Sequence, residues 1–282
     1  MKKMVLAILS VIMVTLLGVM TVGCGKEELN MGKECVKFKT QLDALTQLKE
    51  GTVNVAVIDS VMAGYYTSKG DYKNDLMVVS NLVLAEEKYG IAAKKGNNSL
   101  MHMVNQALIA LSESGEYQNV ASIFGLENST LAIASDPYEG ATDSSWSTVQ
   151  SRKKIVIGYT VFAPISFTDN GNFTGFDTEL ARAVVNVWNE GGSDIEIEFQ
   201  EINWDSKESL LENGTIDLVW NGMTITTARS EEMCISVPYL ANKQVAVIRK
   251  TDASKYTTVE SMAKAVIGVE KGSAGQDVVI KK

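Results

Sequence analysis

Two stretches of this 282-residue chain share one design, in which a helix, a glycine and a buried strand follow one another. In the first, leucines recur at helical spacing before Gly51, and the strand-like TVNVAVID follows. The second repeats it, because LENGTIDL at 211–218 parallels LKEGTVNV at 48–55. Glycine commonly ends a helix, and a strand apolar on both faces is typical of a buried parallel strand. Such punctuation is common and a short match can be coincidence, but it favours two α/β lobes of similar construction.

The end of the sequence begins a further unit of this kind. An apolar strand at 266–269 leads into the small-residue turn KGSAG at 271–275, which is typical of a helix entrance. Seven residues later the sequence stops. This pattern raises the question of which other segment completes the unit.

The first residues predict a targeting segment. Lys2 and Lys3 precede an apolar run and small residues before Cys24, as in a secretory signal peptide. A permanent membrane anchor is the alternative, since the run is nearly long enough to span a bilayer. TVGC resembles a bacterial lipobox, although Thr21 stands where leucine is usual. We therefore expect cleavage of 1–23 and acylation of Cys24.

Composition narrows the classes of function. A 45% hydrophobic content with only 3 prolines indicates a folded chain, and the net charge of −8 disfavours nucleic acid as a partner. Cys35 and Cys234 could pair, but two buried thiols are the favoured interpretation. His102, the single histidine, falls off the apolar face of its helix and is expected to be solvated. We predict neither a metal site nor a cofactor.

A cation placed to hold a carboxylate follows the second unit. Arg229 comes five residues after Thr224, just beyond a strand end, and Thr224 and the backbone near Gly222 could donate as well. A guanidinium can hold a carboxylate through two parallel hydrogen bonds. On spacing alone, a surface ion pair with Glu231 or Glu232 is the favoured alternative.

Other candidates lie at the ends of the apolar strands. Asp59 ends a strand at the edge where ligands bind in open α/β sheets, but it could equally cap the following helix. Gly272, Ser273 and Ala274 open the last helix, so their amides could face a carboxylate, although a plain turn would look the same. Phe162 could pack over a ligand or belong to the core.

Two blocks of the sequence resemble one protein family in reversed order. Residues 151–250, with SFTDNGNFTGFD and INWD, resemble the first lobe of the family 3 solute-binding proteins of amino-acid ABC importers. Residues 34–125 resemble the second half of the same proteins. The resemblance implies the two-lobe, periplasmic-binding-protein-like type II α/β fold in permuted order, with the last unit resuming near 32–34. The alternative is a fusion or truncation remnant of tandem binding proteins.

The resemblance also implies the domain boundaries. The expected parts are a signal peptide at 1–23, a tether at 24–33, the second lobe at 34–88 with 253–282, the first lobe at 89–125 and 151–252, and a linker at 126–150. The linker assignment also follows from its Ser/Thr/Asp-rich composition without Lys or Arg. The strands that cross between the lobes are expected near LVLAEEKYG and VIRKTD.

Carried over position by position, the resemblance implies a ligand site. Arg229 would hold the α-carboxylate, Asp59 the α-amine, and Phe162 would stack on the ligand. The full expected set is Phe162, Asn221, Gly222, Thr224, Arg229, Ser273, Ala274 and Asp59, with INWD and SFTDNGNFTGFD structural. The family often has an acid in a G-x-D pattern after its first strand. Here the stretch is GYTV at 158–161, which weakens the case for a ligand with a cationic side chain.

The function implied is extracytoplasmic binding of a free amino acid between two hinged lobes and its delivery to ABC permease transmembrane subunits. A lipid such as palmitate at Cys24 would hold the protein at the outer face of the cell membrane. A dehydratase-like enzyme on the same fold is an alternative, although no histidine is available in the cleft as an acid or base. A sensor domain or a non-binding remnant is a further alternative.

Overall fold

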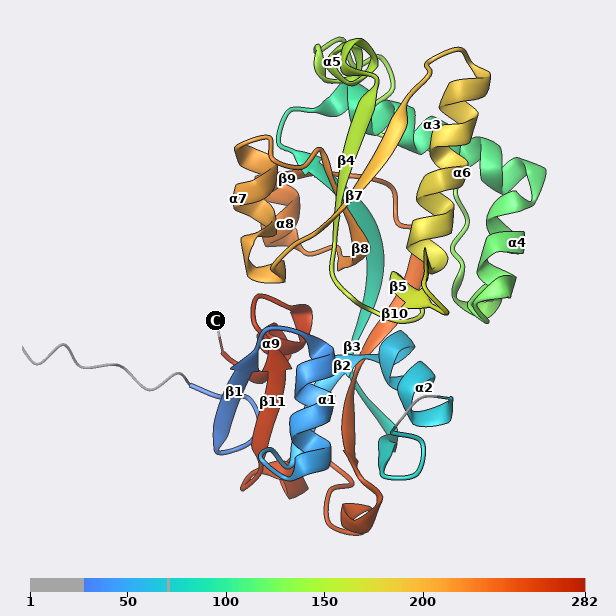
Figure 1. Ribbon diagram of the computed structural model, residues 1–282. Helices are drawn as coiled ribbons and strands as arrows, with labels where there is room; N and C mark the ends of the chain where they lie inside the picture. Colours follow the sequence, from blue (N-terminus) through green and yellow to red (C-terminus); the bar gives the residue numbers. More distant parts are fainter. Residues whose placement is uncertain (1–27, 70–71, 282) are drawn as a thin grey trace, which may run out of the picture.

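The computed structural model describes residues 28–69 and 72–281 (Figure 1). The expected signal peptide and Cys24, the expected site of acylation, lie outside the described residues. Within the described ranges, no helix combines the length and the apolar character needed to cross a membrane.

A single mixed sheet runs through the molecule, and two strands join its halves. The strand order is β1 (Glu34–Phe38), β11 (Val266–Glu270), β2 (Val55–Asp59), β10 (Leu240–Arg249), β3 (Leu76–Lys94), β8 (Leu218–Thr224), β4 (Lys154–Tyr159) and β7 (Glu196–Glu201). A short strand, β9 (Met233–Ile235), also pairs with β3, while β5 (Phe167–Asp169) and β6 (Asn172–Thr174) form a separate pair.

The helices divide the molecule into two lobes (Figure 1). Those packed around β1, β11 and β2, which we call the second lobe, are α1 (Gln41–Glu50), α2 (Ser60–Ser68) and α9 (Ala274–Val279). Those of the first lobe are α3 (Asn98–Ser114), α4 (Glu116–Ile123), α5 (Ser145–Arg152), α6 (Phe176–Glu190), α7 (Lys207–Glu212) and α8 (Thr227–Glu232). Short 3-10 turns are η1 (Glu127–Ser129), η2 (Trp204–Ser206), η3 (Lys250–Asp252) and η4 (Glu260–Met262). The predicted two-lobed α/β architecture is confirmed.

Two long antiparallel strands, β3 and β10, pass from one lobe to the other (Figure 1). The stretch LVLAEEKYG lies within β3, as predicted. The second crossing strand is β10, which covers Leu240–Arg249. The expected position, near VIRKTD at 247–252, is therefore too late in the sequence, because only its first three residues belong to β10.

The two helix–glycine–strand units are confirmed and occupy equivalent places in the two lobes. Gly51 ends α1 at φ +87° before β2, and Gly214 at φ +75° lies between α7 and β8. All five residues of β2 and all seven of β8 are buried. Both strands therefore carry their last residues toward the junction between the lobes.

The unit left unfinished at the end of the sequence is completed by the beginning of the described chain. Strand β1 pairs in parallel with β11, and the Lys281 N–H donates to the Glu28 carbonyl at 2.8 Å. Gly32, at φ +77°, lies so close to β11 that an added Cβ would be 2.5 Å from the Ile267 side chain. The second lobe therefore closes within one chain.

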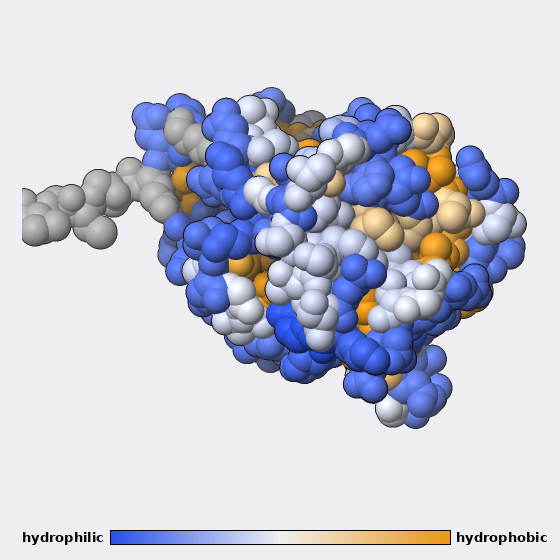
Figure 2. Space-filling view, turned by 90° about the horizontal axis from the view of Figure 1, so that it is seen from above, coloured by the Kyte–Doolittle hydropathy of each residue, from blue (hydrophilic) through white to orange (hydrophobic). Residues whose placement is uncertain are grey.

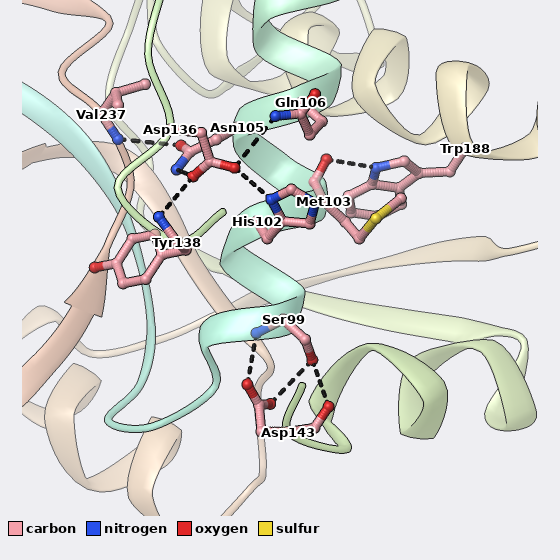
Figure 3. Close-up of polar contacts among 10 residues, drawn as sticks. All are labelled: Ser99, His102, Met103, Asn105, Gln106, Asp136, Tyr138, Asp143, Trp188 and Val237. Atoms are coloured by element: carbon pink, nitrogen blue, oxygen red, sulfur yellow. Dashed lines mark hydrogen bonds and ion pairs between the residues drawn. The ribbon is translucent and has the colours of Figure 1, made fainter. Parts of the chain in front are cut away.

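The segment expected to be a linker is held against α3 (Figure 3). Asp136 accepts hydrogen bonds from His102 and, at 2.9 Å, from Asn105, while Asp143 accepts from the Ser99 N–H at 2.7 Å. His102 is therefore bonded to an acid, and the expectation of a merely solvated histidine is wrong. The linker also ends earlier than 150, since α5 begins at Ser145.

The surface seen from above is mostly hydrophilic, with apolar residues in small separate groups (Figure 2). Cys234 is buried and Cys35 is half-buried, and no disulfide joins the two. The core accordingly owes its stability to apolar packing within and around the sheet rather than to a cross-link between these two thiols.

Candidate functional site

A small enclosed cavity between the lobes collects the polar residues that end the central strands. Its volume is about 10 Å³, about the space that the centre of one water molecule needs. All eight residues expected from the sequence line it, namely Asp59, Phe162, Asn221, Gly222, Thr224, Arg229, Ser273 and Ala274. Four further residues that were not expected also line it: Gln41, Thr160, Trp204 and Glu270.

Asp59, at the end of β2, points into this cavity. It precedes α2, but its side chain makes no capping hydrogen bond, so the alternative role as a helix cap is wrong. Its carboxylate accepts hydrogen bonds from Gln41, from Tyr89 Oη at 2.7 Å, and from Asn242 and Gln244. Burial, with a contribution from the charge of a neighbouring glutamate, raises the pKa of Asp59 to about 7.

Glu270, at the end of β11, is a second buried acid of the cavity. Its side chain is hydrogen-bonded to Gln41, which also donates to Asp59. Burial and, next, the charge of Asp59 raise the pKa of Glu270 to about 8. Nothing in the sequence singles out Glu270, because it ends an apolar strand at a position where an acid can equally well face water.

Arg229 enters from the first lobe and reaches across to the second. It is 7% exposed, Nη1 donates to the Thr224 carbonyl at 2.7 Å, and Nη2 donates to the Gly272 carbonyl at 3.1 Å. The alternative of a surface ion pair with Glu231 or Glu232 is therefore wrong. Both partners are neutral carbonyls, so no acid compensates the positive charge of Arg229 through these bonds. The guanidinium can therefore exchange the carbonyls for a carboxylate.

The polar groups of β8 are hydrogen-bonded to the protein in this conformation. The Gly222 N–H, expected to face a ligand, donates to Asp177 Oδ2 at 2.7 Å, and the Thr224 hydroxyl donates to Glu87 Oε2 at 2.9 Å. The Asn221 amide and the Thr160 hydroxyl are hydrogen-bonded at 2.7 Å. Asp177 accepts this hydrogen bond from Gly222, and burial raises the pKa of the Asp177 carboxyl to about 7.

The remaining wall combines the α9 turn with two aromatic residues. Ser273 caps α9 by accepting from the Gln276 N–H at 3.2 Å and donates to the Glu270 carbonyl at 2.8 Å. Phe162 and Trp204 are 4% and 5% exposed. The INWD motif therefore does more than the structural role expected for it, because Trp204 lines the cavity.

Contacts between the lobes surround this cavity. Asp205, next to Trp204, pairs with Lys271 at 2.6 Å, and Lys207 donates to the Gly272 carbonyl at 3.3 Å. With the bond from Arg229, two cations of the first lobe thus meet the turn before α9. These contacts hold the lobes together in the closed arrangement.

A larger cavity of about 950 Å³ lies at the crossing strands, but none of the expected ligand residues lines it. Its wall includes Glu87 and Asn242, whose hydrogen bond at 2.9 Å links it to the Asp59 network. The smaller cavity remains the candidate site, because it alone of these two joins an arginine to buried carboxylates. Within the described ranges no cluster of three or more His, Cys, Asp or Glu could hold a metal ion.

The buried acids predict how stability depends on pH. Asp59, Asp177 and Glu270 have folded-state pKa values of about 7, 7 and 8, above their ordinary values of 3.8, 3.8 and 4.5. An acid with a raised pKa binds its proton more tightly in the folded state. Its contribution is complete below the ordinary pKa and is lost as the pH rises through the folded-state pKa.

We therefore expect the free energy of unfolding to fall by at least about 3 kcal/mol between pH 5 and pH 9. Urea unfolding at the two pH values measures it. Glu270→Gln should reduce the slope, because the amide does not titrate. A stability that is flat or rises over this interval would contradict the assignment of these three acids as buried and unpaired with a cation.

Part of the chain is similar to known proteins. Residues 155–277 match the family model of bacterial extracellular solute-binding proteins, family 3. A probable histidine-binding protein of Neisseria gonorrhoeae is 35% identical over 122 residues, which are 43% of this chain and 43% of that protein. The arginine-binding extracellular protein ArtP of Bacillus subtilis is 30% identical over 128 residues, 45% of this chain and 47% of that protein. The chain thus matches about half the length of these relatives.

Solved structures give matches of similar extent. An ABC uptake transporter substrate-binding protein from Streptococcus pneumoniae with bound histidine is 41% identical, covers 32% of this chain and 35% of that chain, and has a TM-score of 0.28. A polar amino acid ABC uptake transporter substrate-binding protein from Streptococcus thermophilus is 38% identical, covers 35% and 36%, and also has a TM-score of 0.28. TM-scores this low do not establish a common arrangement, so the fold rests on the strands and helices described above.

Proposed function

We propose that this chain, whose residues 155–277 carry a family 3 solute-binding segment, binds a free amino acid between its lobes. The observation that supports this most is that one cavity holds Arg229 from the first lobe and Asp59 from the second. A free amino acid carries a carboxylate and an ammonium group, and a site that excludes water must pair both. Arg229 would hold the carboxylate and Asp59 the ammonium group.

Closure and binding would then be coupled. The cavity of about 10 Å³ is too small for an amino acid, so the lobes must separate to admit one. Arg229 would exchange its bond to the Gly272 carbonyl for the ligand carboxylate. Because the two charges of the ligand are paired by different lobes, a ligand stabilises the closed form more than the open one.

The relatives and the sequence support a proposal for the cellular role. We infer delivery of the amino acid to ABC permease subunits at the extracytoplasmic face of the membrane, with a lipid at Cys24 as the anchor. The relatives are named as binding proteins, which favours binding over a dehydratase-like reaction. The contact of Glu28 with Lys281 supports a permuted order of family segments over a non-binding remnant, since the ends complete one lobe.

Calorimetric titration of residues 25–282 with the twenty common amino acids tests this function. We expect saturable one-to-one binding of at least one of them. Asp59→Asn should weaken it at least 10-fold, because the ammonium group loses a charged partner in a buried site. The matched control is Asp169→Asn, an exposed aspartate of β5, which should leave the affinity unchanged. A folded protein that binds none of the twenty would refute the proposal.

A further inference from the structure

The candidate site holds more acidic than basic side chains. Asp59 and Glu270 are each 4% exposed. The hydrogen-bond partners of Asp59 are neutral side chains, and Glu270 shares one of them, Gln41. Two buried carboxylates thus share one amide, an arrangement that is costly unless a cation is added.

The charged groups around these acids do not supply that cation. Arg229 is directed at the carbonyls of Thr224 and Gly272. Lys207, the other cation near Glu270, pairs with Glu208 at 2.9 Å and donates to the carbonyls of Trp204 and Gly272.

A third acid adds to the imbalance. The Glu87 carboxylate accepts hydrogen bonds from Asn242 and Gln244, which also bond to Asp59. With Lys207 offset by Glu208, the acidic side chains Asp59 and Glu270 of this cavity and the linked Glu87 of the larger cavity remain against the single cation Arg229. A ligand with equal positive and negative charge would leave this excess as it is.

We propose that Glu270 receives a positively charged ligand side chain, so that the site takes amino acids with a cationic side chain. This rests on the proposed function, in which Asp59 and Arg229 pair the two charges common to all amino acids. The ligand then brings two positive charges and one negative, and each buried carboxylate of the cavity gains a partner. A carboxylate desolvated in advance gains most from such a charge-assisted bond.

This inference reverses the expectation from the sequence. The stretch GYTV lacks the acid that the family often places after its first strand, and Thr160 lines the cavity there. The structure supplies an acid from the opposite lobe, at the end of β11. A cationic side chain would therefore be recognised by the second lobe.

Arginine and citrulline provide the test, since citrulline has nearly the same shape with a neutral side-chain end. For residues 25–282 we expect arginine to bind at least 30-fold more tightly than citrulline in calorimetric titrations at pH 7.5. Glu270→Gln should reduce this ratio to less than 3-fold. The matched control is Glu139→Gln, an exposed glutamate, which should keep the parent ratio.

The possible outcomes separate the two proposals. Binding of neutral amino acids with an arginine-to-citrulline ratio below 3 in the parent would overturn the role of Glu270 and leave the proposed function standing. Binding of no amino acid at all would refute the proposed function itself. The parent ratio alone decides the ligand class if Glu270→Gln fails to fold. A Glu270→Gln protein that folds and keeps the ratio would also overturn the inference.

Discussion

Arg229→Ala should weaken amino-acid binding by at least about 100-fold in calorimetric titration. Among the residues that the structure describes, Arg229 is the one cation that lines the cavity, and it is 7% exposed. A ligand carboxylate held there without water would lose two charge-assisted hydrogen bonds. Each of these is worth about 1.5–3 kcal/mol, and about 3 kcal/mol corresponds to more than 100-fold in affinity.

Arg229→Lys separates charge from geometry. Nη1 and Nη2 donate to carbonyls of different lobes, Thr224 and Gly272. An ammonium group keeps the charge but lacks the planar fork, so we expect an intermediate loss of about 10-fold. Arg182→Ala, an arginine of α6 that pairs with Glu179 and does not line the cavity, is the control and should bind as the parent does. An affinity unchanged in Arg229→Ala would exclude this residue as the carboxylate partner.

Gly175→Ala should cost about 4 kcal/mol in the free energy of unfolding, the largest loss of stability that we expect from one methyl group. Gly175 has φ +133°, and an added Cβ would lie 2.2 Å from the Ile165 carbonyl oxygen. The strained backbone costs about 1–3 kcal/mol and the overlap a similar amount. The overlap cannot be relieved by a side-chain movement, because the Ile165 carbonyl belongs to the backbone. This carbonyl is also held in place, since it accepts a hydrogen bond from the Asp177 N–H at 3.0 Å.

Gly171→Ala provides the matched control. Gly171 lies at φ +83°, but an added Cβ there would meet nothing within 4 Å. Only the backbone cost applies, so we expect a loss of about 1 kcal/mol. Urea unfolding of the two variants measures the difference between them. Equal losses would show that the approach of Ile165 is not what requires glycine at position 175.

The sequence predicted which residues form the candidate site better than it predicted the hydrogen bonds that those residues make. Apolar periodicity and glycine spacing located α1, β2, α7 and β8, because local patterns determine where helices and strands begin and end. The residues at the ends of these strands do meet in one cavity. The partners of Gly222 and Thr224 could not be predicted, since Asp177 and Glu87 come from distant parts of the chain and reach them only through packing.

Two other errors have a physical cause that is visible in the strands. Asn242 and Gln244 interrupt the apolar pattern of β10, so the sequence does not predict a strand at its beginning. In the structure both side chains are buried and donate to Asp59, which accounts for polar residues in a strand interior. Glu270 was missed for a related reason, because the direction of its side chain depends on pairing with β1.

The bridge between the described ends has a mechanical consequence. Leu29 faces Ile280 in an antiparallel bridge, and the Lys281 N–H donates to Glu28. A force that pulls residues 28 and 281 apart acts across these bonds one at a time, since the two segments lie side by side and point in opposite directions. Stretching should therefore peel β1 and α9 from the second lobe at low force, while the first lobe, which contains neither of the pulled residues, stays intact.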